Sequence, residues 1–321
     1  MPSSQNNGAW TIQITSSVEF SSFTMTDAND NNQGGFSLIN IYDPAVANPD
    51  FFNYPISLDS VLTDTDGSEI VSSITLSAVP TGTSIVFDQG TINEVNGELI
   101  IDLTAIENYD INADDIILTT QNQLQAGFQP IIDAVTMEVD TNGDPIVGIP
   151  ESHTIIGNDD DNSLIGADGD DFIDGGAGSD TVSAGIGNDT LVFDSNDILI
   201  DGGSNTDDND RLLLKDGENI DFSSLDNDTN NVIQNMETID LTVNGDHTLD
   251  GLTLADVLSI TDTENPLKIL GDDQDTVILK DDITNTWSPT PTSTTIDSVD
   301  YNLYNGDGGG SVYIQTDVTV N

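Results

Sequence analysis

The strongest constraint on the fold of this chain is a nine-residue repeat between Gly157 and Val192. Four consecutive units keep the same phase: GNDDDNSLI, GADGDDFID, GGAGSDTVS and AGIGNDTLV. They follow the pattern GGxGxDxUx, in which U is a large apolar residue, and the third unit matches it throughout. A short fixed period of this kind is typical of solenoids, in which each repeat buries its apolar residue against its neighbours.

The repeat also indicates a bound cation. Glycines permit turns with positive φ, and the sixth position carries Asn162, Asp171, Asp180 and Asp189. Ca²⁺ takes about six to eight oxygen ligands at about 2.3 to 2.6 Å, and stacked turns can supply them from main-chain carbonyls and carboxylates. Because one coil of such a roll uses two repeats, the turns of alternate units face one another. We therefore predict a parallel β-roll over residues 148–210, with Ca²⁺ as its cofactor.

The predicted ligands in the repeats are Gly157, Asp159, Asn162, Gly166, Asp168, Asp171, Gly175, Gly176, Ala177, Gly178, Asp180, Gly185, Gly187 and Asp189. A run rich in Gly and Asp can also be a disordered acidic linker. The apolar residue at every eighth position disfavours that interpretation in calcium, whereas without calcium the run is expected to be disordered.

The net charge supports an external source of cations. The formal charge is −54, from 58 acidic and 4 basic residues, and the first basic residue is Arg211. Self-repulsion of this size destabilises a compact state unless counter-charge is supplied. The lack of a basic patch excludes binding to nucleic acid or to an anionic membrane surface. There is no cysteine for disulfides, no apolar run long enough for a membrane span, and no cationic and apolar leader typical of a secretory signal.

The flanking regions are also expected to be mainly β. Residues 1–147 alternate apolar and polar residues between turn clusters, which predicts a β-sandwich. Residues 211–321 contain short strand-like segments around LTLADVLSITD, where Thr253 and Asp256 form a capping-box pair. This predicts a β-rich domain with a short helix. The expected organisation is thus three domains, 1–147, 148–210 and 211–321.

Two kinds of candidate site lie in the first domain. Phe51, Phe52 and Tyr54 could form an aromatic platform for a glycan or a peptide, or they could close one end of the sandwich. Acidic loops with alternating oxygen-bearing side chains could bind calcium or be solvated turns. Their residues are Asp64 and Asp66, then Asp110, Asn112 and Asp114, and finally Asp140, Asn142 and Asp144.

Residues from about 150 to 321 resemble the carboxy-terminal end of large RTX adhesins exported by type I secretion. The resemblance lies in the repeats, METIDLTVNGDHTLDGLTLADVLSITD, LKILGDDQDTVIL, Trp287 and VDYNLYNGDGGGSVYIQTDVTV, in that order. Residues 58–80, which contain LTDTDGSE, are similar to extender and ligand-binding modules of such adhesins. The resemblance implies an uncleaved C-terminal signal read by an ABC transporter complex, export C-terminus first, and calcium-driven folding outside the cell. It also implies a role in cell adhesion and biofilms, at the bacterial cell surface.

Three functions follow as hypotheses. The first is a monomeric adhesin segment that binds a surface glycan or peptide. The second is the export tail of a secreted RTX enzyme, although the chain has no HExxH or GxSxG motif and only His153 and His247 as imidazole bases, so we expect no enzymatic activity. The third is a structural extender without a ligand. The start at Met1-Pro2 is expected to belong to a fragment of a longer protein.

Overall fold

The fold is described from a computed structural model. It describes residues 13–14, 35–36, 51–57, 60–61, 69–87, 90–103, 116–140, 144–146, 148–203, 209–215, 217–225, 231–243, 245–261, 266–282, 285–307 and 309–321. The chain divides into two units, residues 1–158 and 159–321. The mainly β fold and the parallel β-roll are confirmed. The predicted domain boundaries at residues 147 and 210 stay predictions.

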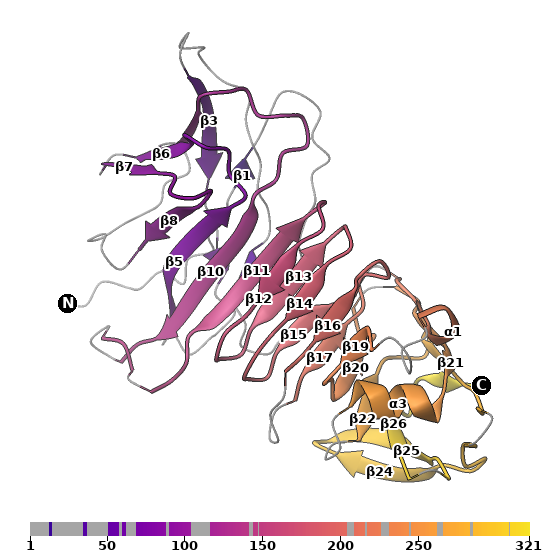
Figure 1. The fold of residues 1–321 in the computed structure, drawn as a ribbon. Coiled ribbons are helices and arrows are strands. Elements are labelled where there is room, and N and C mark those ends of the chain that lie inside the picture. Colours follow the sequence, from indigo (N-terminus) through magenta and orange to yellow (C-terminus); the bar gives the residue numbers. More distant parts are fainter. Residues whose placement is uncertain are drawn as a thin grey trace. The chain divides into compact units, whose positions relative to one another are not determined.

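The first unit contains two antiparallel sheets (Figure 1). One has the order β11-β10-β5-β8, made of Ser152–Asn158, Ile131–Glu138, Glu69–Ser77 and Leu99–Asp102. The other has the order β1-β3-β9-β6-β7, made of Gln13–Ile14, Phe52–Ser57, Ile116–Thr120, Ser84–Phe87 and Gly90–Asn93. A further pair joins β2 (Gly35–Phe36) to β4 (Ser60–Val61). Period-two alternation explains the strands, because Ile74, Leu76, Leu99 and Ile101 are buried between exposed or half-buried neighbours.

The second unit is a parallel solenoid whose coils stack as successive rungs (Figure 1). Its longest sheet has the order β13-β15-β17-β20-β22-β26-β25-β24. These strands are Phe172–Gly176, Thr190–Val192, Arg211–Leu213, Thr238–Asp240, Leu267–Leu270, Ser311–Gln315, Val299–Asn305 and Thr292–Ile296. The last two form an antiparallel hairpin on β26, and the others are parallel. The parallel sheet therefore continues past the repeats almost to the end of the chain.

Two shorter parallel sheets complete the coils. The sheet β12-β14-β16-β19 consists of Ser163–Ile165, Thr181–Ser183, Leu199–Asp201 and Ile233–Gln234. The sheet β18-β21-β23-β27 consists of Ile220–Asp221, Thr248–Leu252, Thr276–Leu279 and Thr319–Val320. Among the described residues there are two short helices, α1 (Phe222–Leu225) and α3 (Leu254–Ile260). None of the helices in the described part of the chain is long and apolar enough to cross a membrane.

The register of the coils follows from the repeat. Leu164 pairs with Val182, and Ile173 pairs with Leu191, so each strand lies beside the strand two units later. All four side chains are buried, and burial of an aliphatic side chain of this size contributes about 1.5 to 3 kcal/mol. The same apolar ladders continue through Ile200, Leu212, Ile233, Ile239, Ile269 and Ile314. The apolar eighth position therefore builds the core of the solenoid.

The predicted helix is confirmed with its capping box. The hydroxyl of Thr253 accepts the backbone N–H of Asp256, and the Asp256 carboxylate accepts the backbone N–H of Thr253. These bonds satisfy amides that the first turn of a helix would otherwise leave without partners. Leu254, Val257 and Ile260 are buried on one face. Helix α3 thus covers the core of the later coils.

Candidate calcium-binding turns

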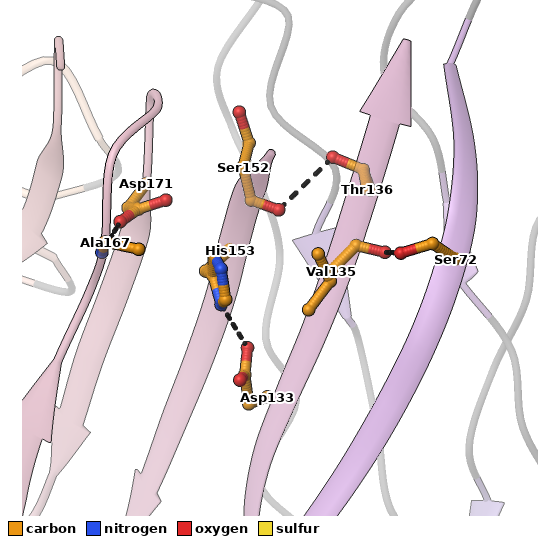
Figure 2. Close-up of polar contacts among 8 residues, drawn as sticks. All are labelled: Ser72, Asp133, Val135, Thr136, Ser152, His153, Ala167 and Asp171. Carbon is orange, nitrogen blue, oxygen red and sulfur yellow. Dashed lines mark hydrogen bonds and ion pairs between the residues drawn. The ribbon is translucent and has the colours of Figure 1, made fainter. Parts of the chain in front are cut away.

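Carboxylates of one turn bind amides of the turn before it along one edge of the solenoid. The N–H of Asp171 donates to Oδ1 of Asp189 at 2.7 Å, and the N–H of Asp189 donates to Oδ1 of Asp210 at 2.8 Å. The N–H of Asp210 donates in turn to Oε2 of Glu237 at 2.8 Å. Within its own turn, Oδ2 of Asp171 accepts the N–H of Ala167 at 2.8 Å (Figure 2). The side chain at the sixth position therefore ties two coils together and shapes its own turn.

The opposite edge carries the same arrangement. The N–H of Asn162 donates to Oδ1 of Asp180 at 2.8 Å, and the N–H of Asp180 donates to Oδ1 of Asp197 at 3.2 Å. Asp171, Asp180, Asp189, Asp197 and Asp210 are all buried. Burying an ionised carboxylate is strongly unfavourable unless a cation or several hydrogen bonds compensate for it. The two edges are thus columns of buried acidic groups.

The pKa values of the second edge show that ionised carboxylates are unfavourable in this arrangement. Burial raises the pKa of Asp197 to about 7, and the neighbouring Asp180 and Asp194 carboxylates raise it as well. Burial also raises the pKa of Asp180, and Asp194, Asp161 and Asp174 add to the effect. A divalent cation between the turns would reverse this, because an adjacent positive charge favours the ionised form.

The donor set fits Ca²⁺. Oδ2 of Asp180 is buried and accepts no hydrogen bond from the described residues, although the residue is 0% exposed. It lies so close to Gly175 that a Cβ on this glycine would collide with it. A Cβ on Gly185 or Gly187 would collide with the carbonyl oxygens of Ala167 and Gly169. Main-chain carbonyls and carboxylate oxygens therefore converge between adjacent turns, and these are the ligands that Ca²⁺ prefers.

This arrangement explains why side chains alone do not reveal a metal site. In the described part of the chain, no group of three or more His, Cys, Asp and Glu residues is placed to hold a metal ion. A cage between repeat turns instead combines few carboxylates with several carbonyls. Asp171, Asp180 and Asp189 would supply the carboxylates. The side chains of Asp159 and Asp168 are exposed, and calcium binding by these two residues stays a prediction.

The other predicted metal ligands have a different outcome. In the loop at Asp140, the N–H of Asp144 donates to Oδ1 of Asp140 at 3.1 Å, and the N–H of Asp140 donates to the carbonyl of Asp144 at 2.8 Å. These bonds join Asp140 to Asp144, and calcium binding by this loop stays a prediction. Six further predicted ligands lie outside the described residues: Asp64, Asp66, Asp110, Asn112, Asp114 and Asn142.

The aromatic candidates differ in their environment. Phe51 is 37% exposed and Phe52 is half-buried, whereas Tyr54 is 3% exposed. The hydroxyl of Tyr54 accepts the N–H of Leu124 at 2.9 Å, so it is directed into the interior of its unit. His153 lies with Nδ1 3.0 Å from Oδ1 of Asp133 (Figure 2). The histidine therefore has a protein partner on the neighbouring strand. Its nitrogen atoms are not expected to bind calcium, because Ca²⁺ takes oxygen ligands.

Sequence reasoning missed three members of the two columns. Asp197 is the fifth residue of its nine-residue unit, Asp210 follows an insertion after Gly203, and Glu237 lies in a segment without the repeat. A signal did exist for Asp210, because Gly202 and Gly203 precede it and Leu212 keeps the apolar phase. Asp197 and Glu237 had no such signal.

The comparisons with known proteins agree with this geometry. The family model of the RTX calcium-binding nonapeptide repeat matches residues 156–191 in four copies. These residues are RTX repeats. RTX repeats bind Ca²⁺ and form a calcium-dependent β-roll, and proteins that carry them are typically secreted. Neither a curated protein nor a solved structure matches the chain.

Proposed function

We propose that this chain is a calcium-dependent segment of an extracellular bacterial adhesin, exported by type I secretion with its C-terminus first. The observation that carries the proposal is the buried Oδ2 of Asp180, which has no partner among the described residues and stands in an RTX turn. A cation beside this oxygen would stabilise the folded state. The ABC transporter complex would read the C-terminal signal before folding.

Calcium would act as a folding switch. The cage between two turns does not exist in the unfolded chain, so the free energy of calcium binding becomes folding free energy. With 58 acidic and 4 basic residues, the chain repels itself wherever calcium is scarce, as in a cytosol. An unfolded chain can pass through a secretion channel, and calcium outside the cell would then fold it. At a free calcium concentration of about 100 times the dissociation constant, one site stabilises the fold by about 2.7 kcal/mol.

The folding switch is tested on the full chain by far-ultraviolet circular dichroism during a calcium titration from excess EGTA. We expect a disorder-like spectrum in EGTA and a β-rich spectrum in calcium. A β-rich spectrum that chelation does not change would refute the proposal. Magnesium at the same concentration is the matched control, because Mg²⁺ requires near-octahedral geometry and gives up its water reluctantly.

Adhesion is the less direct part of the proposal. We propose that the first unit binds a surface glycan or peptide and that Phe51 and Phe52 take part, without enzymatic activity. A glycan and peptide array probed with the full chain in calcium tests this. Phe51→Ala should weaken binding without lowering the melting temperature, because this side chain is partly exposed. Equal array signals for both proteins would exclude Phe51 from the site.

A structural extender is the second candidate, and the burial of Tyr54 favours it. A residue that is 3% exposed and bonded to the N–H of Leu124 stabilises its unit and is not available to a ligand. For an extender, the array shows no ligand at all, and both Phe51→Ala and Tyr54→Phe change only stability. The same array therefore separates the two candidates.

A further inference from the structure

The turn Phe193–Asp197 lies beyond the four RTX repeats, which end at residue 191. Its sequence, FDSND, contains no glycine and carries Asp197 one position too early for the repeat pattern. Nothing in the motif therefore assigns a metal to it. The structure nevertheless stacks this turn directly on the turn Gly175–Asp180, because β16 pairs in parallel with β14.

Asp197 takes the place of a sixth-position residue in this turn. Its Oδ1 accepts the N–H of Asp180 at 3.2 Å, which is the bond that Asp180 makes with Asn162 and that Asp189 makes with Asp171. Its Oδ2 accepts the N–H of Asp194 at 3.3 Å. A carboxylate oxygen has two lone pairs, so each oxygen that accepts one amide can still bind a cation.

The turn is closed by its own hydrogen bonds, which hold its carboxylates in place. Oδ1 of Asp194 accepts the backbone N–H of Asn196 at 2.7 Å, and the N–H of Asp197 donates to the carbonyl of Asp194 at 3.2 Å. In the repeats, glycines with positive φ allow the turn to be tight. Here the hydrogen bonds close the turn, and none of its residues has a positive φ. The side chain of Asp197 is therefore held toward the turn Gly175–Asp180, and it is buried.

A buried oxygen atom without a partner among the described residues lies in the turn Gly175–Asp180. Asp180 is 0% exposed, and its Oδ2 accepts no hydrogen bond from the described residues. Asp194, Asp161 and Asp174 lie close enough to act on it electrostatically, so several negative groups surround it. The ammonium of Lys215 is bonded to Oδ2 of Asp174 at 2.6 Å. A buried anion beside further anions requires a positive charge between the two turns.

We propose that a calcium ion binds between the turn Gly175–Asp180 and the turn Phe193–Asp197, with Asp180 and Asp197 as carboxylate ligands. Main-chain carbonyls of the two turns complete its oxygen shell, and Asp194 adds negative charge at its rim. The ion extends the calcium column of this edge by one coil beyond the recognised repeats. The inference rests on the proposed calcium-dependent fold and adds a site to it.

Native mass spectrometry of the full chain in rising calcium tests the site by counting bound ions. We expect Asp197→Asn to bind one ion fewer than the unmodified chain at the same saturating calcium, because the amide keeps the shape but lacks the charge. Asp170→Asn is the matched control. Its Oδ1 also accepts an amide of the adjacent turn, that of Asn188 at 2.8 Å, but on an exposed surface of the other edge. This control should keep the full number of ions.

A second variant covers the case in which Asp197→Asn does not fold in calcium. Ser195 is exposed in the same turn, so Ser195→Lys keeps both carboxylates and places an ammonium beside them. We expect it to lower the affinity for one ion at least tenfold and to leave the other ions unchanged. If Asp197→Asn folds and keeps the full count, or if Ser195→Lys leaves every affinity unchanged, the site does not exist. If the unmodified chain binds no calcium, the proposed function fails instead.

Discussion

Gly178 offers the sharpest test of how the repeat turns are built. Its φ is +134°, and a Cβ added to it would lie 2.6 Å from the carbonyl oxygen of Asp160 and 3.1 Å from Oδ1 of Asp180. An ordinary contact begins at 3.4 Å, so the carbonyl oxygen must retreat by about 0.8 Å. Calcium–oxygen distances span only about 0.3 Å. Gly178→Ala should therefore damage both the turn and its calcium cage.

The cost of this change has two parts. A non-glycine residue in the left-handed region costs about 1 to 2 kcal/mol. The shift also breaks the bond from Asn162 to Asp180 and the bond from Ser179 to Asp161, at about 1 kcal/mol each. The total is a loss of about 3 to 4 kcal/mol in the free energy of unfolding. Gly309→Ala is the matched control, because its φ is +100° and nothing lies within 4 Å of the added Cβ.

The assay is urea unfolding of each variant in saturating calcium, followed by a calcium titration. Gly309→Ala should lose only the backbone contribution, about 1 to 2 kcal/mol, and keep its calcium midpoint. Gly178→Ala should lose about twice as much free energy of unfolding as Gly309→Ala, and it should need a higher calcium concentration to fold. Equal losses for the two variants would mean that the close approach of Asp160 to Gly178 does not determine the turn, and the reasoning would then be wrong.

Three further predictions concern the coils beyond the repeats. Burial raises the pKa of Glu218 to about 7, and Asp194 contributes to the shift; because the folded pKa lies above the unfolded value of 4.5, stability in constant calcium should fall as the pH rises from about 4.5 to 7. Glu218→Gln should remove that part of the slope, and urea unfolding at pH 5 and pH 8 that gives both proteins the same slope would contradict it. Thr253→Ala should cost about 1 kcal/mol through the lost helix cap, whereas Thr253→Ser should cost little, as thermal unfolding can measure. Lys215→Met should cost about 1 to 2 kcal/mol, because Asp174 is buried while the lysine is partly exposed; a loss that salt does not change in denaturation experiments would argue against an electrostatic origin.

Much of the second unit could be predicted from the sequence because its period is strict. The phase of Leu164, Ile173, Val182 and Leu191 was sufficient to predict which strands pair. The capping pair at Thr253 likewise predicted the start of a helix. Both signals are local, so they do not depend on the rest of the fold.

The remaining coils could not be predicted in this way. Strands β18 to β23 have two to five residues and no common period, so only their pairing in three dimensions shows that the solenoid continues. Glu237 joins the acidic column through such a coil, and Asp197 joins the other through a turn of different shape. Tyr54 illustrates the same limit in the first unit. Its position among prolines and aromatics was compatible with a ligand platform and with a plug at one end of the sandwich, and only the bond to Leu124 places it in the interior.

The most direct test of the central claim is amide hydrogen exchange of the full chain in calcium and in EGTA. The backbone amides of Asp171, Asp180 and Asp189 donate to buried carboxylates of the next coil, so their protection reports the cages themselves. The account predicts strong protection across residues 159–203 and 209–213 in calcium and exchange at the rate of an unfolded chain in EGTA. Equal protection of these amides with and without calcium would contradict it.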